Sequence, residues 1–311
     1  MIQRIIKSLN LRVTKAINTF YYLLNKRRVL VVNAPLFQRV NKVRPFNIGD
    51  DLNYFLLEAL SGKKVIAYWS FYHFGKPIPN VMAIGSIIDW MGNRQATVWG
   101  SGILLPPPIQ PSYKQGYTVN KVVAVRGKKT RACLMQAGLE CPEVYGDPAL
   151  LMPLIYKPKV EKVKGRIGFI PHYKDVKDKD IIRLLNEGGK DAILIKVQKY
   201  SSWHDVIKQI LSCEFIISSS LHGLILSDAY GIPNQWITLQ KALPGGGFKF
   251  DDYYSAVGKE VLPFIITDIT TLSELLEKKE EYQSITFDPR PLLTVCPFEI
   301  VHPAAKELLE M

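Results

Sequence analysis

Short apolar runs that alternate with helical patterns are the feature of this sequence that most restricts its fold. A first set of candidate strands occupies residues 29–33, 65–68, 81–84, 97–99, 122–125 and 144–145, with helices at 50–60 and 128–137. A second set occupies residues 167–170, 192–197, 215–218 and 235–238, with helices at 178–185, 203–211 and 221–230. Such alternation is typical of β-α units built on parallel sheets. It predicts an α/β fold with two Rossmann-like domains facing a cleft.

The segment Pro153 to Lys164 contains Pro158 and a charge-rich run, and it is the predicted linker between these domains. We therefore divide the chain into a basic amphipathic N-terminal helix (residues 1–28), an N-terminal Rossmann-like domain (29–157) and a C-terminal Rossmann-like domain (158–311). The chain's length is sufficient for two sizeable cores.

The positive charge of the chain is concentrated at its beginning. The formal net charge is +12, but ten of the 40 Lys and Arg residues precede Asp50, which is the first acidic residue. The remainder is nearly neutral, because it holds all 28 Asp and Glu residues. A broad surface that follows nucleic-acid phosphates is therefore not expected, and we predict no nucleic-acid partner.

The first 24 residues have the pattern of an amphipathic basic helix. Apolar side chains from Ile2 to Leu24 recur at helical spacing, and Arg4, Lys7, Arg12 and Lys15 lie between them. Such a helix can lie on an anionic membrane surface with its apolar stripe inserted. The alternative is a helix that packs on the domain or on a second subunit.

Two further patterns predict the cell compartment. Basic residues interrupt the N-terminal apolar stripe, so it does not read as a secretory signal, and no apolar run approaches the roughly 20 residues that span a bilayer. The four cysteines are scattered without a C-x-x-C pair, and we expect them to be reduced. We predict a cytoplasmic protein, associated with the inner face of the cytoplasmic membrane if residues 1–24 bind it.

Polar and glycine residues follow most of the candidate strands. Ligands of open parallel sheets bind at the carboxyl ends of the strands, so these residues are candidates for a binding site. They include Asn47, Asp50, Gly100, Ser101 and Arg126 in the first domain, and His172, Ser219 and Ser220 in the second. Several have structural alternatives: Asp50 as a helix cap, Arg126 as a surface residue and Gly100-Ser101 as a turn.

The stretch from Ser218 to Gly223 offers the most specific chemistry. Ser219 and Ser220 lie at a predicted helix start, where unpaired N–H groups and serine hydroxyls can bind an anion. His222 would stand in the first turn of that helix, and an imidazole can exchange protons near neutral pH. The alternative is that the serines cap the helix and that His222 fills a packing position.

Other short motifs accompany this stretch in a fixed order. They are Asn47-x-Gly49-Asp50, Trp99-Gly100-Ser101-Gly102, Val125-Arg126-Gly127 and Gly146-Asp147-Pro148, followed by Leu221-His222-Gly223, Asp228-Ala229 and Gly231-Ile232-Pro233. Together they cover roughly residues 29–240, and in this order they resemble the polysaccharide pyruvyl transferase family.

The resemblance implies both a fold and an activity. It implies two domains similar to those of GT-B glycosyltransferases, with residues 29–157 on the acceptor side and 158–311 on the donor side. It also implies transfer of a pyruvyl group from phosphoenolpyruvate to a hexose of a lipid-linked surface-polysaccharide precursor, forming a ketal. Phosphoenolpyruvate is then the donor substrate, no cofactor or metal is expected, and His222 and Arg126 handle the donor.

The chain departs from the family pattern at one position. Many members have an arginine directly before the Leu-His pair, and this chain has Ser220, which cannot form a charged bidentate clamp. Arg126 or a lysine such as Lys249 is expected to compensate. We assign His222 as general acid, and Arg126 with the N–H groups after Ser219 and Ser220 as anion holders. Asp50 and His172 are expected to contact substrate, together with Asn47, Gly100, Ser101, Leu221 and Gly223.

Two other classes of function remain open on the sequence. A nucleotide-sugar glycosyltransferase would share the expected architecture, because a fold does not dictate its chemistry. A non-enzymatic, membrane-peripheral scaffold of polysaccharide assembly is suggested by the N-terminal helix.

Overall fold

The first half of the chain forms a parallel five-stranded sheet. The computed structural model describes residues 2–35, 38–39, 42–43, 46–73, 78–106, 117–239 and 246–311. The order of the strands is β4-β1-β5-β6-β7, and they are β1 (Val29–Val32), β4 (Lys64–Ala67), β5 (Asn80–Met82), β6 (Ala96–Trp99) and β7 (Lys121–Ala124). A small antiparallel pair is made by β2 (Gln38–Arg39) and β3 (Lys42–Val43).

The second half forms another parallel five-stranded sheet. Its order is β12-β11-β10-β8-β9, with β8 (Ile167–Ile170), β9 (Ala192–Leu194), β10 (Phe215–Ser218), β11 (Asn234–Leu239) and β12 (Phe264–Ile266). Numbered within each sheet, both follow the order 2-1-3-4-5 of doubly wound folds. The direction of winding reverses between β1 and β5 in the first sheet, and between β8 and β10 in the second. These switch points are where such folds bind ligands.

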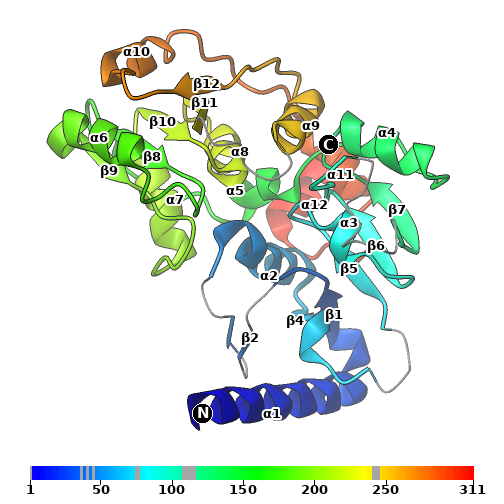
Figure 1. The fold of residues 1–311 in the computed structure, drawn as a ribbon. Helices are drawn as coiled ribbons and strands as arrows, with labels where there is room; N and C mark the ends of the chain where they lie inside the picture. The colour runs from blue at the N-terminus through cyan, green and yellow to red at the C-terminus, as the bar shows by residue number, and fades with distance from the viewer. Residues whose placement is uncertain are drawn as a thin grey trace.

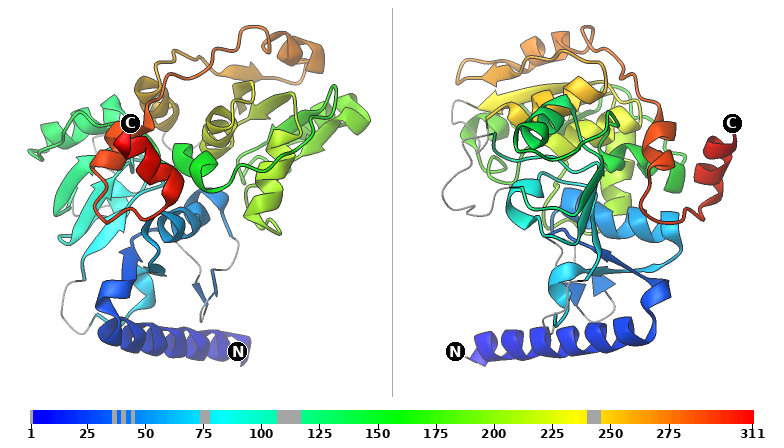
Figure 2. Two further views of the ribbon diagram at one scale, coloured as in Figure 1. Left: turned by 180° about the vertical axis from the view of Figure 1, so that it is seen from behind. Right: turned by 90° about the vertical axis from the view of Figure 1, so that its right-hand side faces the viewer.

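Helices flank both sheets, as Figures 1 and 2 show. In the first half they are α1 (Ile2–Leu24), α2 (Ile48–Ser61), α3 (Ile88–Met91), α4 (Lys128–Gln136) and α5 (Met152–Ile155), with short 3-10 turns η1 (Lys26–Arg28), η2 (Tyr68–Ser70) and η3 (Pro148–Leu151). In the second half they are α6 (Lys179–Gly188), η4 (Gly189–Asp191), α7 (Trp203–Leu211), α8 (Leu221–Ala229), α9 (Phe248–Ala256), α10 (Leu272–Glu277), α11 (Pro289–Thr294) and α12 (Pro303–Glu310).

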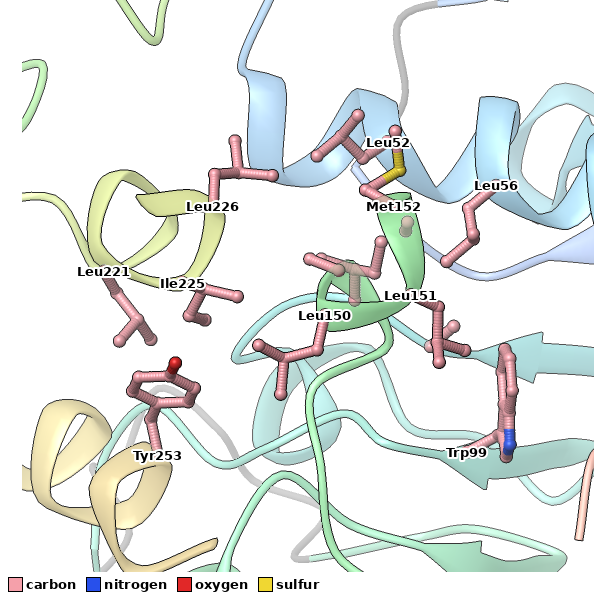
Figure 3. Close-up of a cluster of buried hydrophobic side chains, with 14 of the residues drawn as sticks. Leu52, Leu56, Trp99, Leu150, Leu151, Met152, Leu221, Ile225, Leu226 and Tyr253 are labelled. Carbon is pink, nitrogen blue, oxygen red and sulfur yellow. The ribbon is translucent and has the colours of Figure 1, made fainter. Parts of the chain in front are cut away.

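A packed apolar joint connects the two halves. Leu52 and Leu56 of α2, Leu150 to Met152, and Leu221, Ile225 and Leu226 of α8 belong to one buried cluster, shown in Figure 3. The backbone also crosses the joint, since the Ile48 amide donates to the Val197 carbonyl at 2.8 Å. The two sheets therefore share a core at this place, and an open cleft between them stays a prediction.

The end of the chain returns to the first sheet. The Trp99 Nε1 of β6 donates to the carbonyl of Leu292 in α11 at 2.8 Å, and the Val301 amide donates to the carbonyl of Leu60 in α2, also at 2.8 Å. Residues 289–310 thus pack against the half that is distant from them in sequence, and the proposed domain limits stay a prediction.

Most expected elements are confirmed within one to three residues, and the deviations have local causes. Residues 144–145 form no strand: Tyr145 makes only an isolated bridge to Val125. The expectation missed β2, β3, β12, α3, α5 and α9 to α12, because very short strands and helices with few periodic apolar residues give little pattern. Among the described residues, no helix combines the length and the apolar character needed to cross a bilayer.

Candidate active site

The imidazole of His222 lies where the two halves meet. His222 occupies the first turn of α8, and Gly49 occupies the first turn of α2. A side chain at position 49 would overlap the imidazole ring, so the absence of a Cβ atom lets α2 and α8 approach here. The glycine of the Asn47-x-Gly49-Asp50 motif is therefore required by the position of the histidine.

The environment of His222 keeps its imidazole neutral. Burial lowers its pKa to about 3, and the nearby charges of Lys249 and Arg126 lower it further in the same direction. Its Nε2 atom is shielded from solvent and has no hydrogen-bond partner among the described residues. The imidazole is thus a polar group held between two helices with its Nε2 atom unpaired among the described residues, and a catalytic role for it, as against a packing role, stays a prediction.

The three serines before α8 have different roles. The Ser218 hydroxyl accepts from the Ser220 amide at 3.0 Å, and the Ser219 hydroxyl donates to Asp175 Oδ2 at 2.7 Å. Ser220 occupies the N-cap position but makes no side-chain cap bond. Ser220 is therefore the N-cap residue by position, as the cap interpretation expected, but its hydroxyl does not cap the helix.

His172 is the second imidazole of the site, and it lies across the switch point of the second sheet. It follows β8, and its amide donates to the Ser219 hydroxyl after β10 at 2.9 Å. Burial, together with the charges of Lys249 and Lys174, lowers the pKa of His172 to about 4. Asp175, which accepts from Ser219, is also buried, and burial raises its pKa. The structure thus brings His172 and Ser219 together, as their places after neighbouring strands predicted.

Lys249 supplies a buried cation that the chain does not neutralise directly. The residue is 9% exposed and lies in the first turn of α9. Its ammonium lies 5.2 Å from the centre of the Phe250 ring, and it has no hydrogen bond or ion pair with any other described residue. Burial lowers its pKa to about 8, and the charge of Arg126 acts in the same direction while Asp175 opposes it. We refer to His222, His172 and Lys249 as the His222 cluster. No pattern in the sequence indicated that Lys249 is buried.

Arg126 is fully buried and paired. Its Nε donates to Asp252 Oδ2 at 2.9 Å, its Nη2 donates to the Ile103 carbonyl at 3.0 Å, and its Nη1 donates to the Ser86 hydroxyl. Asp252 also accepts from the backbone amide and hydroxyl of Thr130 at 2.7 Å each. The surface interpretation of Arg126 is therefore wrong. Asp252, which sequence reasoning missed, ties the end of β7 to α9.

Asp50 is a carboxyl group suited to proton exchange. Burial raises its pKa to about 7, and the neighbouring Asp51 adds to this effect, whereas the Asn47 Nδ2, which donates to Asp50 Oδ2 at 2.7 Å, opposes it. Asp50 lies inside the first turn of α2, and Asn47 is the N-cap residue. The interpretation of Asp50 as the cap itself is therefore wrong.

Comparison with known proteins identifies the family. The family model described as polysaccharide pyruvyl transferase matches residues 47–239, which is more than half of the chain. The chain belongs to the polysaccharide pyruvyl transferase family. The matched range contains every predicted site residue from Asn47 to Gly223, whereas Lys249 and Asp252 lie beyond it.

Two relatives of this pyruvyl transferase family member show how far the likeness extends. The chain is 30% identical over 223 residues to the uncharacterized protein L143 of Acanthamoeba polyphaga mimivirus, covering 70% of this chain and 73% of that protein. It is 25% identical over 256 residues to the succinoglycan biosynthesis protein ExoV of Rhizobium meliloti, covering 79% of this chain and 73% of ExoV. These findings support a pyruvyl transfer role in polysaccharide biosynthesis.

The remaining family motifs hold the backbone in place. Gly100 has a φ of 92° and packs against Pro148, and the buried Ser101 hydroxyl donates to the Ala83 carbonyl at 2.8 Å. Asp147 caps η3 by accepting from the Ala149 amide at 2.9 Å. Substrate contact by Gly100 and Ser101 stays a prediction, because every contact described for them is with protein.

Leu221 and Gly223 also have packing roles at the start of α8. Leu221 is buried in the joint of Figure 3, and a side chain at position 223 would meet the Ser218 hydroxyl and Ile170. Their expected contact with substrate stays a prediction. Across the described residues, no three His, Cys, Asp or Glu side chains are grouped to hold a metal ion, and metal independence likewise stays a prediction.

Proposed function

We propose that the chain transfers a pyruvyl group from phosphoenolpyruvate to a hexose of a lipid-linked surface-polysaccharide precursor, forming a pyruvate ketal. The observation that carries the proposal is the His222 cluster. His222 lies in the first turn of α8, and the charge of Lys249, a buried lysine without a described hydrogen bond or ion pair, lowers the pKa values of both His222 and His172. A bound anion that accepts hydrogen bonds would stabilise the lysine charge, accept from the amides at the helix start and raise the pKa values of the imidazoles.

Phosphoenolpyruvate matches this electrostatic pattern because it carries a phosphate and a carboxylate. The backbone amides at the start of α8 can donate to one anionic group, and the Lys249 ammonium can pair with the other. In this proposal Lys249 compensates for the arginine that is missing before Leu221. The charge of Arg126 reaches the same region, since it lowers the pKa of both His222 and Lys249. We therefore propose that Arg126 assists donor binding in two ways. Its positive charge favours an anion in this region, and its ion pair with Asp252 holds α9, which carries Lys249, in place.

The reaction needs a proton donor at one carbon. Protonation of the methylene carbon of phosphoenolpyruvate makes the central carbon cationic, and a sugar hydroxyl attacks it. The bond from that carbon to the phosphate oxygen then breaks, and inorganic phosphate leaves. A second hydroxyl of the same sugar attacks the same carbon and closes the ketal. Of the two hydroxyl protons, one balances the proton delivered to the methyl group and the other leaves with phosphate.

His222 is the proposed general acid, and the bound donor is what charges it. In the free protein the imidazole is neutral at pH 7, because its pKa is about 3. A dianionic phosphate beside the ring offsets the charges of Lys249 and Arg126 and raises this pKa towards neutrality. Donor binding would then be accompanied by uptake of a proton. His222 would therefore carry the proton that a general acid needs only in the complex with the donor.

Asp50 is the proposed base on the acceptor side. Its pKa of about 7 lets the carboxylate accept a proton from a sugar hydroxyl at neutral pH. His172 is a proposed contact for phosphate or acceptor, and Asn47 orients Asp50 through their 2.7 Å hydrogen bond. In this proposal the acceptor binds beside α2, the donor binds beside α8, and the enzyme acts in the cytoplasm.

The donor can be identified directly. Purified protein is incubated with lipid-linked glycan and either phosphoenolpyruvate or nucleotide sugars, and the release of inorganic phosphate or nucleoside diphosphate is measured. The proposal expects phosphate from phosphoenolpyruvate and a glycan heavier by one pyruvate ketal in the mass spectrum. Nucleoside diphosphate release would favour a glycosyltransferase, which two Rossmann-like sheets could also support. Turnover of neither donor, with no effect of His222 substitution, would favour the scaffold.

A further inference from the structure

The N-terminal helix α1 packs on the protein through its polar side. Thr14, Asn18 and Thr19 are buried against the body of the protein. The Asn18 Nδ2 donates to the Ser70 carbonyl at 3.1 Å, and the Tyr72 amide donates to the Thr19 hydroxyl at 2.9 Å. The helix is therefore seated by specific hydrogen bonds to the segment after β4, which fixes the side that it turns outward.

The side turned outward is apolar. Val13, Ile17, Phe20 and Leu24 recur at the i, i+4, i+7 and i+11 positions of one helical stripe. All four are exposed, and Phe20 and Leu24 reach 66% and 67%. In the sequence, Ile2, Ile6 and Leu9 continue the same spacing. This is the reverse of an ordinary surface helix, in which the apolar stripe faces the core.

The charges around this stripe restrict its partner. Arg12, Lys26, Arg27 and Arg28 are exposed on or directly after α1, and no acidic residue precedes Asp50. A second copy of the same face would bring like charges together. An anionic lipid surface instead offers both an apolar interior for the stripe and negative headgroups for the basic residues.

We propose that α1 docks the protein on an anionic phospholipid bilayer, with Val13, Ile17, Phe20 and Leu24 inserted among the lipids. Figures 1 and 2 place α1 along one end of the molecule, below the first sheet and away from α10 and β12, and within the described part of the chain these four side chains are exposed. The proposal does not depend on the enzymatic activity, because it rests on a surface that lies outside the His222 cluster.

The test is sedimentation of the full-length protein with phospholipid vesicles. Wild-type protein is expected to bind vesicles that mix phosphatidylcholine with phosphatidylglycerol, and to bind pure phosphatidylcholine at least about tenfold more weakly. The double substitution Ile17→Glu and Phe20→Glu is expected to reduce binding to the mixed vesicles by at least about tenfold. A matched control is Leu262→Glu with Ile269→Glu, which changes the charge equally at the more exposed Leu262 and Ile269, 87% and 83% exposed.

Each outcome decides the proposal. Lost binding in the α1 variant, with an unchanged melting temperature and normal binding by the control, supports it. Replacing Lys26, Arg27 and Arg28 by glutamine should selectively weaken binding to the mixed vesicles, and this variant leaves the apolar stripe intact. Unchanged binding by both α1 variants, or no binding by wild-type protein, overturns the proposal. A dimer in light scattering that dissociates in the Ile17→Glu and Phe20→Glu variant would assign the face to a second copy instead.

Discussion

Two buried polar clusters in the second half of the molecule differ in whether the chain satisfies them. In the Asp228 cluster, Asp228 accepts from Lys259 at 2.7 Å, from Tyr253 and Asn234 at 2.8 Å each, and from Tyr282 at 3.1 Å. In the His222 cluster, the imidazole of His222 and the ammonium of Lys249 have no such partner among the described residues. Asp228 is 4% exposed and Lys249 is 9% exposed, so the burial of these two charged groups does not separate the clusters.

This difference is the basis for the proposal that the Asp228 cluster stabilises the fold and that the His222 cluster binds a ligand. A buried charge with several hydrogen bonds is compensated within the folded chain, and removing one partner is costly. A buried cation without such compensation lowers stability, and it is retained where a ligand completes it. The family signature contains both Asp228 and His222, and only the structure shows that Asp228 is fully paired whereas His222 Nε2 has no hydrogen-bond partner among the described residues.

The largest effect is expected from removing the imidazole of His222. His222→Ala should reduce pyruvyl transfer by about 10²- to 10⁴-fold, because the proposed proton donor is lost. The melting temperature should change little, since Nε2 makes no described hydrogen bond. Initial rates of phosphate release from phosphoenolpyruvate measure the first quantity and thermal unfolding measures the second. Full turnover by this variant would exclude His222 as the acid.

The opposite pattern is expected in the Asp228 cluster. Lys259→Met should lower the free energy of unfolding by about 3 kcal/mol or more, because it leaves a buried carboxylate without its counter-ion. Denaturant titration followed by circular dichroism gives this value. The matched control is Lys278→Met, which removes a surface ion pair with Glu281 and should cost no more than about 1 kcal/mol. Equal losses in the two variants would remove the distinction between the clusters.

Lys249→Met should separate binding from stability. We expect the KM for phosphoenolpyruvate to rise by roughly 10- to 100-fold, since a buried charged contact with the anion is lost. The same variant should be as stable as the wild-type protein or more stable at pH 7. The pKa of Lys249 is lowered to about 8 in the folded state, so charging it below that pH opposes folding. Any stability gain should therefore disappear as the pH rises above about 10. Lys174→Met, at an exposed neighbouring position, is the control.

The smallest expected effect concerns Asp50 and pH. Its pKa is raised to about 7 in the folded state, so its contribution to stability is present at low pH and is lost as the pH rises towards 7. Asp50→Asn should thus raise the free energy of unfolding at pH 8 by about 1–2 kcal/mol and have little effect at pH 4. Urea titrations at the two pH values test this, with the exposed Asp205→Asn as control. A gain of equal size at both pH values would contradict the raised pKa.

Residues that share a local pattern were the most predictable part of the site. His222, Ser219 and His172 follow strands whose apolar runs are clear in the sequence, and parallel strands bring their carboxyl ends to one edge. The short strand β12 and helices α9 to α12 were missed, and with them the elements that carry Lys249 and Asp252. The ion pair of Arg126 with Asp252 could therefore not be predicted, because the element that carries Asp252 had not been recognised.

The sequence by itself determined the order of the β-α units, the helix start at His222 and the basic amphipathic character of residues 1–24. These properties depend on neighbours within a few residues, for which periodicity and capping rules are sufficient. Only the tertiary structure decided that Arg126 is neutralised by Asp252, that Lys249 is buried without a described partner, and that α1 turns its apolar side outward. Charge balance and exposure depend on residues that are far apart in the chain, and their desolvation is fixed only when the two halves pack together.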